Sequence, residues 1–169
     1  HLPNSDTGST AKRVGISKTG DWGYLGLSFS DNDNLYGVPF HGDDHEEVEG
    51  VEPEEERIFS TTESKVINLE GSYVLDNDWL TKIDYNFRDS DYSHTEQHAE
   101  EEGHETEAPG IPHLDEEGPT TFSNEAKEYG AIFDIGNNSL SQKVAVNYVV
   151  EDVAVIGDVR LSSNFTGVG

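Results

Sequence analysis

Histidine and carboxylate side chains gather in two segments of this 169-residue chain. Nine acidic residues lie between Asp43 and Glu56, and nine more lie between Glu96 and Glu117. Six of the seven histidines lie within or beside the same two segments. Imidazole and carboxylate together suit Zn²⁺, Cu²⁺ or Ni²⁺, whereas carboxylate alone suits Ca²⁺ or Mn²⁺. The expected chemistry is the capture of a divalent metal ion, with zinc as the expected metal.

The candidate ligands are these histidines and the acids closest to them. Two pairs of histidines are spaced four residues apart, and two aspartates lie inside the first pair. The predicted ligands are His41, Asp43, Asp44, His45, His94, His98, His104 and His113. Zn²⁺ binds neutral imidazole, so capture should weaken as the pH falls through the range in which histidine becomes protonated. The surrounding acids add a negative field that concentrates cations near the ligands.

Two alternatives to this zinc site stay open. One is a solvated acidic loop in which the histidines are incidental. The other is a carboxylate-bound Ca²⁺ at Asp31–Asn34, a segment similar to part of a calcium loop. That segment lacks the glycine and the glutamate that the EF-hand pattern requires at its sixth and twelfth positions.

The composition excludes several other classes of function. A formal charge of −25 opposes binding to nucleic acid and to anionic membrane surfaces. The chain has no cysteine, so disulfides, thiolate metal sites and cysteine nucleophiles are excluded. The sequence contains no nucleophile elbow, phosphate loop or His-Glu-x-x-His motif. We therefore expect a protein that is not an enzyme.

The elements that hold these residues are predicted to be strands. Between the acidic segments, apolar and polar residues alternate; in one strand Leu25, Leu27 and Phe29 share one face and Gly26 and Ser28 the other. Such alternation is typical of strands with one apolar face. The predicted strands are about 13–18, 23–31, 65–75, 80–91, 125–135 and 142–150, with the segment after residue 149 giving one further strand or two.

The links between these strands alternate in length. Tight links contain Gly, Asn and Asp, which tolerate the positive φ of hairpin turns. The long links are about 32–57 and 92–122. We therefore predict a single β-rich segment over residues 1–169. It is an all-β antiparallel meander of six to seven long strands, with tight turns at one end and long acidic loops at the other. Outer-membrane β-barrels have this asymmetry, and a soluble β-sandwich is the alternative.

Several stretches of the sequence resemble one family in order and spacing. They are Gly23–Ser30, Tyr36–Pro39 with the His-rich loop that follows, 66–71, 83–94 and 121–126. Over roughly residues 2–150, the chain resembles the early barrel strands of TonB-dependent outer-membrane receptors, in the branch associated with zinc uptake. The chain lacks that family's plug domain and most of its barrel. It begins at His1 and has no methionine, so we expect a mature or excised piece.

The resemblance implies a location and a role. It places the chain in the bacterial outer membrane, with long extracellular loops that capture metal for uptake. TonB would act only through the plug that this chain lacks. Two alternatives remain: a secreted or excised extracellular β-rich subunit that forms a homo-oligomer or polymer through its strand edges, and a soluble acidic metal-binding β-sandwich.

Overall fold

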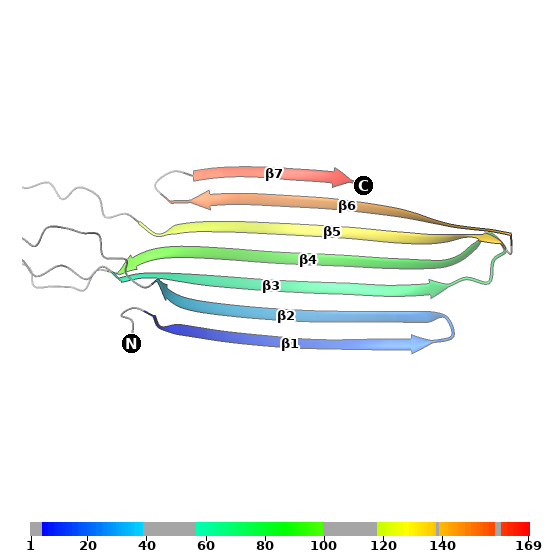
Figure 1. The fold of residues 1–169 in the computed structure, drawn as a ribbon, viewed down its shortest axis with the longest axis horizontal. Helices are drawn as coiled ribbons and strands as arrows, with labels where there is room; N and C mark the ends of the chain where they lie inside the picture. Colours follow the sequence, from blue (N-terminus) through cyan, green and yellow to red (C-terminus); the bar gives the residue numbers. More distant parts are fainter. Residues whose placement is uncertain (1–4, 39–56, 100–117, 138, 158–159) are drawn as a thin grey trace, which may run out of the picture.

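The computed structural model describes residues 5–38, 57–99, 118–137, 139–157 and 160–169. The chain forms seven strands that alternate in direction within one sheet (Figure 1). Their bounds are β1 Thr7–Gly20, β2 Gly23–Val38, β3 Arg57–Val74, β4 Leu80–Ala99, β5 Thr120–Asn137, β6 Leu140–Ile156 and β7 Arg160–Val168.

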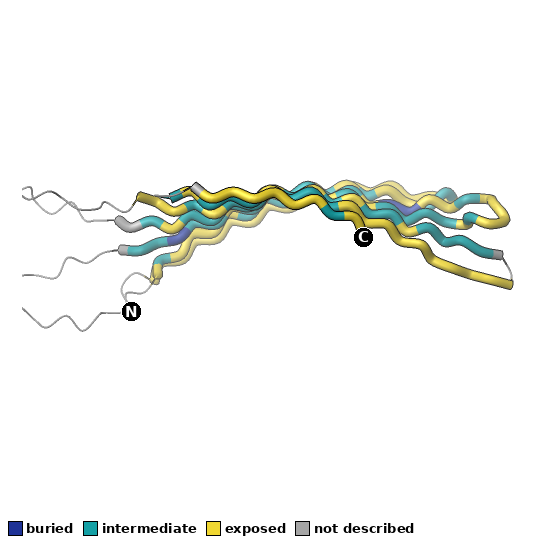
Figure 2. The backbone as a smooth tube through the Cα atoms, turned by 90° about the horizontal axis from the view of Figure 1, so that it is seen from above, coloured by how far each residue is buried: buried dark blue, intermediate teal, exposed yellow. Residues whose placement is uncertain are grey.

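Each strand pairs only with its neighbours in the sequence. The spatial order is β1-β2-β3-β4-β5-β6-β7, and every pair is antiparallel. Seen along its plane, the sheet is one curved layer (Figure 2). The predicted all-β antiparallel meander is confirmed. The described residues do not form the two packed sheets of a β-sandwich.

The strands are longer than the alternation pattern predicted. Strand β2 continues to Val38 and strand β4 to Ala99, so both extend into segments that the sequence assigned to loops. The predicted strands were too short because polar and acidic residues were assigned to loops. Such residues can continue a strand when both neighbouring strands supply its hydrogen bonds. The sequence left the strands after residue 149 open, and the structure ends β6 at Ile156 and begins β7 at Arg160, so this short link lies at the loop end.

The register places most large apolar side chains of the turn half on one face, with Tyr24, Val74 and Ile132 among the exceptions. Leu27 lies opposite Ile16 on β1 and Leu69 on β3, and residues opposite each other share a face. We call this the apolar face and the other the polar face. The exposed large apolar residues of this face in the turn half are Val14, Ile16, Leu25, Leu27, Phe29, Ile67, Tyr73, Tyr129, Leu140, Val144, Val146, Tyr148 and Val168.

The sheet has almost no core. Among the described residues, Val66 is the one buried hydrophobic side chain, at 8% exposure. By contrast, Ile16 is 76% exposed and Tyr148, the least exposed of the apolar face set, is 38% exposed. A soluble monomer rarely exposes a contiguous apolar surface of this kind.

A row of charged side chains crosses the apolar face on its loop side. In register across six strands, the row is Lys12, Asp31, Lys65, Asp91, Glu125 and Asp152. Its first four members alternate in sign, and opposite charges facing each other across strands are stabilising. This row, the charge row, limits the apolar part of the face on the side of the long loops.

Candidate metal centre

The structure describes one of the predicted metal ligands in full. His94 lies on β4, near the loop end of the sheet. His98 lies further along β4, in the register position opposite Ile58, but its side chain is outside the described residues. The other predicted ligands, His41, Asp43, Asp44, His45, His104 and His113, also lie outside the described residues. Their predicted role is untested by the fold.

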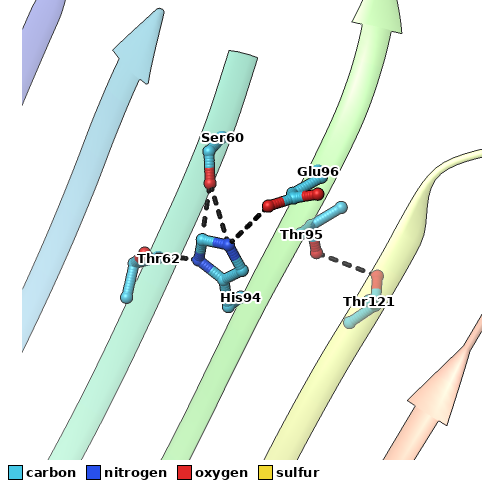
Figure 3. Close-up of polar contacts among 6 residues, drawn as sticks. All are labelled: Ser60, Thr62, His94, Thr95, Glu96 and Thr121. Carbon is cyan, nitrogen blue, oxygen red and sulfur yellow. Dashed lines mark hydrogen bonds and ion pairs between the residues drawn. The ribbon is translucent and has the colours of Figure 1, made fainter. Parts of the chain in front are cut away.

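The ring of His94 lies against the hydroxyl groups of β3. Thr62 stands directly opposite His94, and its Oγ1 lies 3.0 Å from His94 Nδ1. Ser60 Oγ lies 3.2 Å from Nε2 and 3.4 Å from Nδ1 (Figure 3). The Thr62 contact is the shorter one to Nδ1. A hydroxyl can donate or accept, so this contact fits either neutral tautomer of His94.

Glu96 is the acidic neighbour of His94. Strand alternation puts both side chains on the polar face, two residues apart on β4. Glu96 Oε1 lies 3.4 Å from His94 Nε2 (Figure 3). The His94 side chain is 23% exposed and the Glu96 side chain 64% exposed. The carboxylate is therefore open to solvent while the imidazole is partly enclosed.

The enclosure of His94 has a simple local cause. Ser60, at 1% exposure, is small and leaves room for the imidazole above β3. The ring of Tyr36, which is opposite Ser60 on β2, lies 6.5 Å from the His94 ring between centroids. Hydroxyl-bearing and β-branched residues such as Thr61 and Thr62 favour the strand that carries these contacts.

Sequence reasoning missed Glu96, Ser60 and Thr62. No apolar–polar alternation marks residues 93–98 as a strand, because all six are polar, so the sequence offered no usable signal for Glu96. The hydroxyls of Ser60 and Thr62 carry no sequence signal for a metal site. Only the β3–β4 register brings them to the imidazole.

The described residues hold no group of three or more His, Cys, Asp or Glu side chains placed to bind one metal ion. His94 and Glu96 therefore offer two protein ligands. Two is fewer than the three or four of stable zinc sites. Chemically, the pair fits an exchangeable cation better than a permanent structural metal.

Comparisons of the chain with protein-family models, with curated proteins and with solved structures found no match. Within the described residues, no helix is long and apolar enough to cross a membrane.

Proposed function

We propose that this chain is a section of the wall of a TonB-dependent outer-membrane receptor of the zinc-uptake branch, whose acidic loops capture the metal for uptake. One observation carries the proposal: a single-layer antiparallel sheet carries an apolar face across strands β1 to β6. In membrane barrels the lipid-facing side chains are apolar and the interior is polar. The sheet has this division, with tight turns at one end and the long links at the other.

The size of the apolar face supports the proposal. On β2 it runs from Gly23 to Ser30, just before Asp31 of the charge row. Those eight residues extend about 27 Å along the strand at about 3.4 Å each. At the tilt of about 35–45° of barrel strands, this length spans about 19–22 Å of height, close to the apolar band of about 25 Å in outer-membrane barrels. Trp79, 60% exposed, and the packed pair Trp22–Tyr73 lie at the turn end, where such barrels carry an aromatic girdle.

The two edges of the sheet set a condition on how it closes. Strands β1 and β7 both run from the loop end to the turn end (Figure 1). Joining β7 of one copy to β1 of another would make a parallel pair. Joining β1 of one copy to β1 of another, or β7 to β7, as an antiparallel pair would put the loops of the two copies at opposite ends. An all-antiparallel barrel with every loop on one side therefore needs an odd number of further strands beside these seven.

A lipid-contact scan tests the membrane part of the proposal. The chain has no cysteine, so single cysteines at residues 25 to 30 accept one fluorescent label each. The labelled full chain is mixed with phosphatidylcholine vesicles that carry brominated acyl chains, which quench a fluorophore in the hydrocarbon. We expect strong quenching at 25, 27 and 29 and weak quenching at 26, 28 and 30. Equal quenching at all six positions, or none, contradicts the proposal.

A zinc titration tests the metal part separately. The full chain is compared with a variant in which His41, His45, His94, His98, His104 and His113 are changed to Ala. We expect the unaltered chain to bind Zn²⁺ and the variant to lose at least about tenfold in affinity, because imidazole ligands are removed while the acidic field stays. Equal binding by both chains would contradict capture by these histidines.

The second candidate function is a polymer formed through the strand edges. The observation that favours it is that β1 and β7 each pair on one side only within the described sheet. Unpaired edges are ready templates for another strand. Sedimentation of the full chain in detergent-free buffer separates the candidates: ordered polymers support this one, and a stable monomer counts against it.

A further inference from the structure

We infer that His94 and Glu96 form a two-residue zinc clamp on β4, at the point where the loop end meets the polar face. The inference rests on the proposed metal capture and assigns it a place on the sheet itself. It adds Glu96 as a ligand and Thr62 as the residue that orients the imidazole. Both lie outside the ligand set that the sequence predicted.

The distance between the two side chains fits a shared metal. Glu96 Oε1 and His94 Nε2 are 3.4 Å apart. A charge-assisted N–H···O bond is shorter, at about 2.7–2.9 Å. Two atoms bound to one tetrahedral Zn²⁺ at about 2.0–2.1 Å each lie about 3.3–3.4 Å apart. The pair is therefore too open for a strong ion pair and has the spacing of two ligands on one zinc ion.

The surroundings of His94 are compatible with the same role. Zn²⁺ binding through Nε2 requires the tautomer in which Nδ1–H is donated, and Thr62 Oγ1, 3.0 Å from Nδ1, can accept that hydrogen bond. Metal-bound histidines commonly donate their second ring N–H to an acceptor that fixes the ring. Thr62 has that role here.

The position of the clamp suits a transient cargo site. Within the part of the chain that the structure describes, two protein ligands leave two tetrahedral positions for water or for another ligand. The 64% exposure of Glu96 keeps the carboxylate accessible from the loop side, while Ser60 and Tyr36 enclose the imidazole. A weak, open site of this kind can receive Zn²⁺ from the loops and release it again.

The test isolates the strand site from the loops. In a full-chain background with His41, His45, His104 and His113 changed to Ala, Zn²⁺ is titrated and imidazole ¹⁵N shifts are recorded. We expect zinc to shift Nε2, and not Nδ1, of His94. Glu96→Gln and Thr62→Val should each weaken this binding by about 10–100-fold.

Matched controls separate the clamp from general effects of charge or folding. Glu63→Gln removes one acid from β3 on the apolar face, and Thr95→Val removes the hydroxyl that contacts Thr121 on that face. Both controls should bind zinc like the background. Thr62→Ser retains a hydroxyl and should restore binding, and circular dichroism checks that each variant keeps its strands.

Three results would overturn the clamp: no zinc-induced shift at His94 in the background, equal affinity in Glu96→Gln, or a loss of affinity as large in the two controls as in the clamp variants. These results would not test zinc binding by the loop histidines. The six-histidine titration described above tests that binding separately.

Discussion

Tyr85 lies over the backbone of Gly71, which stands directly opposite it across β3 and β4. A Cβ built on Gly71 would meet the hydroxyl end of the Tyr85 ring, and it would lie 2.8 Å from the carbonyl oxygen of Tyr24 on β2. The tyrosine thereby covers a glycine that would otherwise leave a gap in the apolar face. Aromatic cover of a strand glycine is a known stabilising device in sheets.

The first prediction concerns this contact. Gly71→Ala should lower the free energy of unfolding by roughly 1–3 kcal/mol, because the methyl group displaces Tyr85 and meets backbone that cannot move away. Urea unfolding followed by circular dichroism measures the change. Gly26→Ala is the matched control: its nearest neighbour would be 3.7 Å away, so stability should be unchanged or slightly higher. Equal losses in the two variants would contradict the packing argument.

The second prediction concerns the apolar face. Leu27→Arg should weaken association with phosphatidylcholine vesicles by roughly 2–4 kcal/mol, the cost of a charge on the lipid face near the bilayer midplane. Ser28→Arg, the next residue along β2, places the same charge on the polar face. It should leave vesicle association nearly unchanged. Vesicle flotation of the two variants at equal concentration measures the difference, and identical behaviour would show that the two faces do not differ toward lipid.

The third prediction concerns the charge row. Lys65 stands between Asp31 and Asp91, so Lys65→Glu places three acids side by side. We expect a loss of stability of roughly 1–2 kcal/mol, summed over the two cross-strand pairs, and a smaller loss in high salt because these charges are screened. Lys18→Glu, opposite Leu25 on the edge strand, is the control and should have little effect. A loss in Lys65→Glu that is independent of salt would point to a steric cause instead.

The fourth prediction concerns pH. Zinc affinity of the full chain should fall between about pH 7.5 and about pH 5.5, because Zn²⁺ must displace the proton from each histidine that it binds. Binding through carboxylates alone should change little over that range, since acids stay ionised. Isothermal titration with Zn²⁺ at both pH values, with Ca²⁺ as the comparison, measures this. A pH-independent zinc affinity would assign capture to the acids.

Alternation in the sequence was sufficient to predict the sheet, the antiparallel meander and the faces of its middle strands. Leu25, Leu27 and Phe29 alternate with Gly26, Ser28 and Ser30, and the structure places these sets on opposite faces. A period of two needs no tertiary information, because successive side chains of any strand point to opposite sides. The lengths of β2 and β4 were underestimated, because hydrogen bonds from neighbouring strands extend a strand through polar residues.

The sequence by itself determined the residue chemistry: histidine and acid in two segments, apolar residues at alternate positions, and glycine at tight turns. Only the tertiary structure decided which residues meet. Register is a property of paired strands, and shifting a pair by one residue would move every side chain to the other face. The β3–β4 register puts Thr62 beside His94 and Gly71 beneath Tyr85, and the six-strand register assembles the charge row.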